Sequence, residues 1–509
     1  MSVRVISTPL RGTSLTQAGI AGKASGWYVA RPTSGAEWKQ RADEMRSALV
    51  SDDWLAALAP ALDATSLAAS RLERAAESGF AVTTGQQPGL FGGPLYTWWK
   101  ALSALALANH LEKLAGIPVV PIFWAATDDS DFLEAADTTV ALNDRSVTIA
   151  LPLGASDGNA LSRRPLGDVT AQLEQLTMAA GSAASARILE DVRAAYASNQ
   201  TIGGAYVALL RAVLNPLGIA VIDASHKATR AAALPVLITA LRRATEVDAA
   251  LVNRSTELKA AGHAPQVKLV KARSLVFADK SGRRERVSVI AAGQVADSAA
   301  SADLGANVLL RPIVERSIIP TVAYVGGPAE IAYFAQVSAV AAALGTPAPL
   351  VVPRWSGIVV EPRIDRILEK HKLGIAELRD PHAAETRIAR ASLPAELQTR
   401  IENVRESIQK TTAALATAEG ADLVPSKVIE GLKGSLARRI DRLERRYSAA
   451  VKRRGNDALS DVASARASLF PRNVPQERAL NVVPLLARHG DTLFSDVMRE
   501  VEPHVAALT

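Results

Sequence analysis

The stretch from residue 80 to residue 132 constrains the fold of this chain more than any other part of its sequence. A β-prone run at 80–84 leads into a loop rich in glycine and glutamine, and an amphipathic run then extends from Pro94 to Gly116. A second apolar run at 118–126 ends in Asp128, Asp129 and Asp131. Two short apolar runs on either side of a long helical pattern are typical of a βαβ unit. Because open α/β sheets bind ligands beyond the carboxyl ends of their strands, we expect a small-molecule site there.

The same pattern occurs again at 320–356. An apolar run at 320–325 precedes the turn 326–328, a helix is expected at 329–344, and another strand at 349–352 ends before Arg354. A further short apolar run at 218–223 is typical of a buried strand. Strands that alternate with helices predict an α/β fold with a parallel sheet and helices on both faces.

Composition excludes several classes of protein. The chain has 509 residues, of which 48% are hydrophobic, so it can bury a large core in several domains. It has no cysteine, which rules out disulfides, thiolate zinc sites and cysteine nucleophiles. The sequence has no run of about 18 apolar residues and its N-terminus lacks the apolar core of a signal peptide, so we expect a cytoplasmic protein without a membrane span.

The positive charge points to anionic partners. The net charge is +7 and the pI is about 9.6, which suits anionic metabolites or nucleic acid. Residues 436–454 hold eight Lys or Arg against two acids, with Tyr447 as the single aromatic. Because aromatic side chains are so scarce there, a solvated helix face is favoured over an RNA-binding face, and nucleic acid is an unlikely partner.

Three domain-like parts are expected. Residues 1–380 form the core, interrupted at about 263–311 by an inserted module whose composition around 279–282 indicates a hairpin. Residues 381–468 carry apolar positions with alternating spacings of four and three at 397–415 and 436–447, which predicts an antiparallel α-helical coiled coil. Residues 469–509 begin with a proline-rich turn and are expected to pack back on the core.

The loop after the first strand supplies the first candidate site residues. Glycines in this loop let a backbone approach a ligand and expose N–H groups, and a helix that starts near Pro94 adds its positive end. The alternative is a tight turn without a ligand. The loop matches neither GxGxxG nor the phosphate-binding GxxxxGK[ST] pattern, which disfavours nicotinamide enzymes and Walker-type ATPases. The candidate substrate- or nucleotide-binding residues here are Thr84, Gly85, Gln86, Gln87, Gly89, Phe91, Gly93 and Tyr96.

The second candidate group is acidic. Asp128, Asp129 and Asp131 lie within four residues, with Glu134 behind them, and such carboxylates repel one another unless a cation is present. A substrate ammonium or Mg²⁺ would suffice. The alternative is that Asp129 or Asp131 caps a helix. We take the three aspartates as the candidate catalytic residues.

The third candidate group lies in the second unit. Gly326, Gly327, Glu330 and Tyr333 surround the start of the expected helix, and Arg354 follows the next strand. An arginine at this edge suits a carboxylate or phosphate, although a salt bridge to one of the nearby acids is an equal alternative. Arg311 is a weaker candidate of the same kind. The seven histidines form no metal-ligand spacing, so no metal site is predicted from them.

Four segments of the sequence, at 84–97, 121–132, 324–333 and 469–481, together resemble the bacillithiol biosynthesis cysteine-adding enzyme family. Residues 84–97 resemble its TGQQxGLFxGPLYT signature, 121–132 its PVFW…EDHDF segment, and 324–333 its YxGGPxEIxY segment. Residues 469–471 and 475–481 resemble its LFP…QER..N stretch. The resemblance implies a Rossmann-like core related to class I nucleotidylyltransferases, an inserted connecting module, a helical coiled coil and a homodimer. The implied reaction joins L-cysteine to glucosaminyl malate through an amide bond.

The chain departs from this family pattern at two positions. Ser130 stands where the family has histidine, and Asp128 stands where it has glutamate. A serine hydroxyl cannot replace histidine as a general base at neutral pH, so the departure leaves the proton-transfer role and the acceptor substrate open.

Roles follow from the implied reaction. One of the three aspartates would hold an ammonium or deprotonate the amine, and Arg354 would hold malate or a phosphate. ATP with Mg²⁺ is the candidate activating pair, although the class I nucleotide-binding patterns are not evident. Two alternatives stay open, namely a same-fold amide ligase or nucleotidyl-transfer enzyme acting on another sugar amine, and a noncatalytic RNA-binding protein built on a synthetase-like core.

Overall fold

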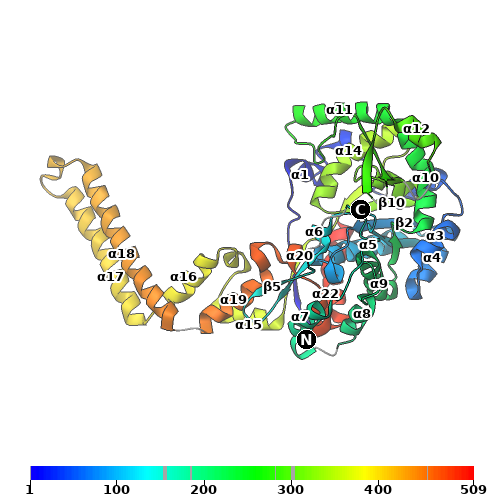
Figure 1. Ribbon diagram of the computed structural model, residues 1–509. Coiled ribbons are helices and arrows are strands. Elements are labelled where there is room, and N and C mark those ends of the chain that lie inside the picture. The colour runs from blue at the N-terminus through cyan, green and yellow to red at the C-terminus, as the bar shows by residue number, and fades with distance from the viewer. Residues whose placement is uncertain are drawn as a thin grey trace. The chain divides into compact units, whose positions relative to one another are not determined.

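The computed structural model describes residues 2–152, 158–183, 186–280, 283–299, 304–391, 393–454 and 457–509. The chain divides into two compact units (Figure 1). The first comprises Met1–Val140, Val147–Val359 and Gln476–Thr509, and the second comprises Ala141–Ser146 and Val360–Pro475. The domain limits expected from the sequence stay a prediction, because compactness alone does not define a folding domain.

A five-stranded parallel sheet forms the centre of the first unit. Its order is β11-β10-β2-β3-β6, with β2 at Phe80–Gln86, β3 at Val119–Ala125, β6 at Ala220–Asp223, β10 at Thr321–Gly326 and β11 at Val351–Pro353. The chain builds outward from β2 through β3 to β6 and then crosses to β10 and β11 on the other side. This confirms the predicted parallel α/β core, and the reversal makes the β2–β10 junction a topological switch point.

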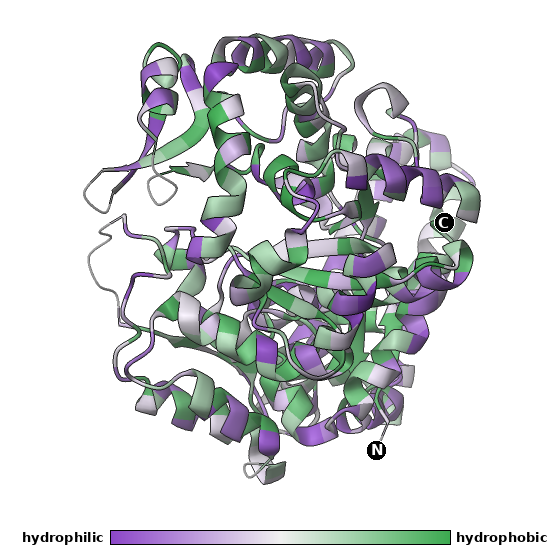
Figure 2. Cartoon of the chain, turned by 90° about the vertical axis from the view of Figure 1, so that its right-hand side faces the viewer, coloured by the Kyte–Doolittle hydropathy of each residue, from purple (hydrophilic) through white to green (hydrophobic). Residues whose placement is uncertain are grey.

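Helices cover both faces of the sheet. On one face, the alternate residues Val120, Ile122 and Trp124 of β3 share a core with α3 (Trp54–Leu62), α4 (Ser66–Ser78) and α10 (Lys227–Arg242). On the other, α5 (Leu95–Ala115) packs on β2 and β3, and α9 (Ile202–Leu214) packs on β6. Hydrophobic colour is concentrated on the strands and hydrophilic colour on outer helix surfaces (Figure 2).

Helix α5 differs from its expectation as an amphipathic helix. Its residues are buried on nearly all sides, from Leu95 to Ala108. The reason is tertiary, because α22 (Thr492–Ala506), α2 (Gly35–Ser47) and α20 (Gln476–Ala479) pack on the sides that the sheet leaves open. Helices α20 and α22 thus belong to the first unit, and the domain limits expected for the C-terminal segment stay a prediction.

The inserted module carries a separate small sheet in the order β8-β7-β9, which is antiparallel where β7 meets both neighbours. Its elements are β7 (Arg273–Lys280), β8 (Arg283–Ser288), α12 (Ala292–Asp297) and β9 (Leu304–Ala306), and α13 (Arg311–Ile318) follows. The pairing of β7 with β8 confirms the predicted hairpin strands, whereas the turn expected at 279–282 lies partly outside the described residues.

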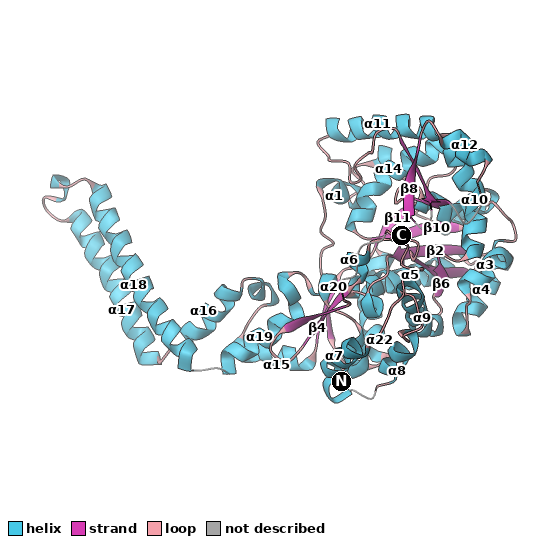
Figure 3. Cartoon of the chain, viewed as in Figure 1, coloured by secondary structure: helices cyan, strands magenta, loops and turns pink. Residues whose placement is uncertain are grey.

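The second unit is helical apart from the short segment Ala141–Ser146 and the turns between its helices (Figure 3). Helices α17 (Ala395–Thr417) and α18 (Ser426–Arg454) lie side by side as an antiparallel hairpin, linked by ion pairs from Arg405 to Asp441 and Glu444. This confirms the helical hairpin that the 4-3 spacing predicts. Helices α15 (Pro362–His371) and α16 (Pro381–Ala391) both pack on α19 (Asp457–Leu469).

The remaining elements lie at the ends and in the connections. They are β1 (Arg4–Ser7), α1 (Ser14–Ile20), α6 (Phe132–Ala135), β4 (Asp137–Ala141), β5 (Ser146–Ala150), α7 (Thr170–Ala180), α8 (Arg187–Ala195), α11 (Ala244–Ala260), α14 (Pro328–Leu344), β12 (Gly357–Val360) and α21 (Val483–His489), with 3-10 turns between them.

Candidate active site

A cleft opens at the carboxyl ends of β2, β3 and β10, at the switch point of the sheet. Its walls come from the β2–α5 loop, the segment after β3, the inserted module, the β10–α14 turn and the C-terminal segment. The position is the one that the two strand–loop–helix units predict. Gly85 allows the close packing at this edge, because a Cβ atom there would lie 2.7 Å from the main-chain oxygen of Trp124.

Most of the candidate residues meet in this cleft. Residues more than 240 positions apart along the chain share one wall, because β2 and β10 are neighbours in the sheet. The candidates that line the cleft are Gly85, Gln86, Gln87, Tyr96, Asp128, Asp129, Gly327, Glu330, Tyr333 and Arg354.

Six candidates lie outside the cleft lining, namely Thr84, Gly89, Phe91, Gly93, Asp131 and Gly326. Thr84 is fully buried, and its hydroxyl donates to the Val325 carbonyl oxygen at 2.8 Å, which ties β2 to β10. Phe91 packs on Tyr196 with ring centroids 4.8 Å apart. The exposed Asp131 caps α6, where it accepts from the Glu134 N–H. These residues shape the walls rather than face the cleft.

Hydrogen bonds to other main-chain groups of the protein fix the glycine-rich loop. The N–H groups of Gly92 and Gly93 donate to Gly89 and Leu90 inside the loop, and the Leu95 N–H at the start of α5 donates to Leu480. These donors, which the sequence suggested for a ligand, are therefore already used by the fold.

Asn481 fixes the same loop. It is fully buried, and its side-chain amide donates to the Phe91 carbonyl oxygen at 2.9 Å and to those of Leu90 and Gly93 at 3.3 Å. Its side-chain oxygen accepts from the Val483 N–H at 2.8 Å. The sequence marked Asn481 only through the family resemblance, and the structure gives it this bridging position.

The acidic group is divided between different partners. Asp128 accepts from Arg284 of the inserted module, whose guanidinium also donates to the Asp128 carbonyl oxygen. Asp129 accepts from the Gln87 amide at 2.6 Å and from the Asp131 N–H at 2.8 Å. The repulsion expected among these carboxylates is thus relieved by protein donors.

Glu134, the last residue of the acidic group, has a raised pKa. It lines the cleft, and burial, reinforced by the charges of Asp131 and Asp129, raises the pKa of its carboxyl above the ordinary value. A carboxylate with a raised pKa is a better proton acceptor for an amine than an ordinary one. The sequence placed Glu134 only behind the aspartates, because its contribution depends on burial.

An ion pair connects helix α5, which follows β2, with helix α14, which follows β10. Lys100 of α5 lies 2.7 Å from Glu330 of α14 and donates to the Gly85 carbonyl oxygen, and both side chains line the cleft. Burial lowers the pKa of Lys100. Burial alone would raise the pKa of Glu330, but Lys100 and the Gly327 N–H outweigh it and hold that pKa below its usual value. Lys100 escaped sequence reasoning because it lies inside an apolar helical run.

Glu330 also occupies the start of α14. Its carboxylate accepts from the Gly327 N–H at 2.7 Å, so the helix end that could receive an anion is capped by the protein itself.

Arg354 is committed to another acid. It is only 2% exposed, and its two terminal nitrogens contact the two carboxylate oxygens of Glu477 at 2.9 and 2.7 Å. Its Nη1 also donates to the Trp355 carbonyl oxygen at 2.7 Å. Of the two interpretations of Arg354, this geometry favours the salt bridge, with the partner supplied by the QER segment rather than by the acidic group.

Two other arginines of the cleft are available to contact an anionic ligand. Arg286 of β8 and Arg478 of α20 line the cleft, and neither has a salt-bridge partner among the described residues. The cleft lining contains six Lys or Arg side chains and four Asp or Glu side chains, but Arg354 is paired with Glu477 and Arg311 with Glu315, so the remaining charges balance. An anionic group of a ligand would therefore be held locally by Arg286 or Arg478.

The described part of the chain contains no group of three or more His, Asp or Glu side chains arranged to hold a metal ion. The acidic residues of the cleft already contact Arg284 and Gln87, so they do not form a metal cage. Among the described residues, no helix is both long and apolar enough to cross a membrane.

Two family models together match most of the chain. The family model described as "Bacillithiol biosynthesis BshC, N-terminal Rossmann-like domain" matches residues 23–302 and 294–355. The model described as "Bacillithiol biosynthesis BshC, C-terminal coiled-coil domain" matches residues 357–508.

Curated relatives agree with these models. A protein of Solibacter usitatus named "Putative cysteine ligase BshC" is 31% identical over 472 residues, covering 88% of this chain and 87% of the relative. Proteins with the same name from Koribacter versatilis and Symbiobacterium thermophilum are 30% and 28% identical, over 84% and 96% of this chain and 83% and 96% of those relatives.

Proposed function

Because the chain belongs to the bacillithiol biosynthesis BshC family, we propose that it is a ligase that joins the carboxyl group of L-cysteine to the amine of glucosaminyl malate. The observation that carries this proposal is the cleft at the switch point, which combines a proton acceptor with unpaired cationic side chains. The relatives are named as cysteine ligases, and the acceptor amine is our inference.

The proposed reaction needs an activated carboxyl group. A carboxylate is a poor electrophile, so an ATP-type nucleotide would first convert it into an acyl phosphate or acyl adenylate. The amine nitrogen then forms the new C–N bond, the C–O bond to the activating group breaks, and that group leaves with the electron pair. The amine must lose a proton, and we take Glu134 as the acceptor because it lines the cleft and its pKa is raised.

The cationic side chains would hold the anionic parts of the substrates. Arg286 and Arg478 are the candidates for the malate carboxylates or the nucleotide phosphates, in place of Arg354. Any Mg²⁺ would arrive on the phosphates, since the protein presents no ligand cage for it and Mg²⁺ commonly binds through substrate phosphates.

The second unit supports a homodimer as part of the proposal. Several apolar side chains of α18 stay exposed in the single chain, among them Val428 at 56% and Leu432 at 45%. The family model of this region is a coiled-coil domain. We propose that a second copy covers this stripe, as apolar stripes on coiled-coil helices commonly require. A cytoplasmic location likewise stays part of the proposal.

The test is direct. The purified protein is incubated with L-cysteine, glucosaminyl malate, ATP and Mg²⁺, and product mass is followed with and without ATP. Absence of the amide product in both cases would refute the assignment. A panel of other sugar amines tests the alternative that Ser130 marks a different acceptor, because a better acceptor than glucosaminyl malate would identify it.

The site is tested with two substitutions. Glu134→Gln and Gln87→Ala should each lower kcat, the first by removing the proton acceptor and the second by releasing Asp129. Leu133→Gln is a matched control next to Glu134, since Leu133 is 72% exposed and does not line the cleft. Full activity in both site variants would show that the chemistry occurs elsewhere.

A further inference from the structure

Helix α18 carries most of the net positive charge of the chain. Residues 436–454 hold eight Lys or Arg and two acidic side chains, so this segment alone supplies +6 of the net charge of +7. Five exposed arginines in the segment, which we call the arginine face, are Arg438, Arg439, Arg442, Arg445 and Arg446. The proposed ligase reaction gives them no role.

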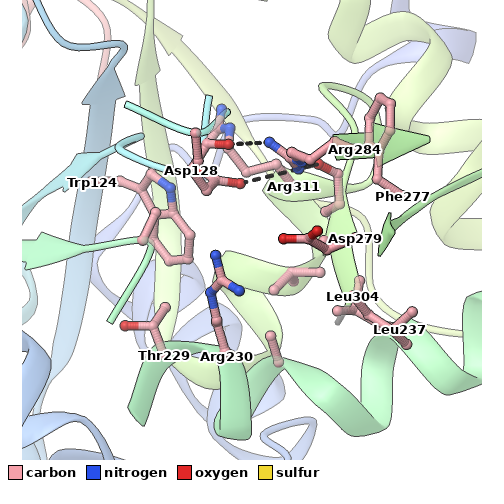
Figure 4. Close-up of a pocket in the computed structure, with 16 residues that line it drawn as sticks. Trp124, Asp128, Thr229, Arg230, Leu237, Phe277, Asp279, Arg284, Leu304 and Arg311 are labelled. Atoms are coloured by element: carbon pink, nitrogen blue, oxygen red, sulfur yellow. Dashed lines mark hydrogen bonds and ion pairs between the residues drawn. The ribbon is translucent and has the colours of Figure 1, made fainter. Parts of the chain in front are cut away.

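The arginine face has no acidic partner in the described part of the chain. Near the cleft, by contrast, Arg284 contacts Asp128 (Figure 4) and Arg163 contacts Asp279. Among the described residues, none of the five arginines of α18 forms an ion pair or a side-chain hydrogen bond. Like charges three or four residues apart destabilise a helix, so these arginines gain from binding a polyanion.

The acidic side chains of the same segment lie on another side of the helix. Asp441 and Glu444 both contact Arg405 of α17, and Glu444 is only 9% exposed, so this side of α18 packs on α17. At about 100° per residue, the five arginines lie roughly 100–160° around the helix from Glu444 and within an arc of about 120°. The arginine face therefore points away from α17 and is open to a partner.

The chemistry and spacing of the arginine face suit a row of phosphates. A guanidinium contacts phosphate oxygens through two parallel hydrogen bonds and keeps its charge at any physiological pH. From Arg438 to Arg446 the helix rises about 12 Å, which corresponds to about three or four phosphates of one duplex strand. Because the arginines spread over an arc rather than a line, they can reach strands on both sides of a groove.

The helix favours a duplex over a single strand. Single strands are bound by stacking their bases on aromatic rings, and Tyr447 is the one aromatic residue of α18. The scarcity of aromatic side chains that argues against RNA in the sequence therefore does not apply to a duplex, which is held through its phosphates.

Two further features favour DNA. An α-helix fits the major groove of B-form DNA, which is about 12 Å wide, whereas the major groove of duplex RNA is too narrow. Within the arc, no large apolar side chain lies between Arg438 and Arg446. A helix that binds a membrane surface inserts such side chains, so an anionic membrane is disfavoured.

We propose that the arginine face of α18 binds the phosphate backbone of double-stranded DNA without sequence preference. The helix contains no Asn or Gln, the side chains that read adenine, so phosphate contacts dominate. This interaction is separate from the cleft and does not depend on the proposed ligase reaction. Five phosphate contacts would make log K fall with log salt concentration at a slope of about −4.5.

The experiment measures fluorescence anisotropy of a labelled DNA duplex of about 20 base pairs with the full-length protein, at about 50 to 200 mM salt. The test variant combines Arg438→Gln, Arg442→Gln and Arg445→Gln, because glutamine has nearly the same helix propensity as arginine. The control combines Arg242→Gln, Arg400→Gln and Lys410→Gln, which removes the same charge from exposed cations that have acidic partners.

We expect the test variant to weaken DNA binding at least tenfold and to flatten the salt slope by about 2.7, the value for three lost contacts. The control should bind DNA within about twofold of wild type, since the arginine face is intact. If the test variant loses its cooperative melt, Arg439→Gln with Arg446→Gln replaces it, with an expected flattening of about 1.8.

Four results would overturn the proposal. They are no DNA binding by the wild type at the lowest salt, an equal loss in the control, tighter binding to an RNA duplex of the same length, and arginine-dependent binding only to vesicles of equal parts phosphatidylcholine and phosphatidylglycerol. The second result would reduce the effect to net charge, and the last would identify a membrane-binding face.

Discussion

Replacing Arg354 by leucine tests whether this residue stabilises the fold or binds a ligand. Arg354 and Glu477 form a two-point ion pair at 2.9 and 2.7 Å, with side chains only 2% and 11% exposed. Removing one partner of such a pair leaves a buried charge without compensation, which costs about 3–5 kcal/mol. The Trp355 carbonyl oxygen also loses its donor. We expect Arg354→Leu and Glu477→Leu each to lower the free energy of unfolding by that amount.

The double variant sharpens the test. Arg354→Leu combined with Glu477→Leu leaves no isolated charge, so it should cost less than the sum of the single variants and give a coupling energy above about 1 kcal/mol. Urea unfolding followed by tryptophan fluorescence is a suitable assay, because all seven tryptophans belong to the first compact unit.

An exposed pair provides the control. Arg242 and Asp297 lie 3.4 Å apart with side chains 63% and 74% exposed, so Arg242→Leu should cost less than about 1 kcal/mol. The reasoning fails if Arg354→Leu changes stability as little as Arg242→Leu does. It also fails if the only effect of Arg354→Leu is weaker substrate binding, since that would make Arg354 a ligand-binding residue.

Three further variants probe the loop, the proton acceptor and the coiled coil. Asn481→Ala removes the buried amide that donates to the Leu90, Phe91 and Gly93 carbonyl oxygens, of which Leu90 keeps the Gly93 N–H as a donor, and it should cost about 1–3 kcal/mol in urea unfolding. A loss below about 0.5 kcal/mol would contradict the bridging role of Asn481. Glu134→Gln should remove an acidic limb of the pH–kcat profile that lies above the ordinary glutamate pKa. The raised pKa means that ionised Glu134 destabilises the fold at pH values above the pKa that this carboxyl has in the unfolded chain. Glu134→Gln should therefore not lower Tm at pH 7, and a lower Tm would contradict the raised pKa. Leu432→Asp on α18 should convert a dimer into a monomer in sedimentation experiments, with Glu430→Gln as the control on the same helix, and an unchanged mass would reject α18 as the interface.

The candidate site could be predicted in outline because its signals are local. Each of two apolar runs is followed by a glycine-rich turn. Because the two strands are parallel, both turns lie at the same edge of the sheet. The hairpin of α17 and α18 was predictable for a similar reason, since apolar spacing by itself specifies which helix faces meet.

Sequence alone determined the α/β class, the family resemblance and the two turns that flank the cleft. The tertiary structure decided which charges are available there. Arg354 is neutralised by Glu477 across 123 positions of sequence, and Lys100 becomes a cleft residue only because α5 is buried. The physical reason is that a hydrophobic period depends only on residues that are close in the sequence. The ionisation and pairing of a side chain depend on burial and on partners that come within a few ångströms only when the chain folds.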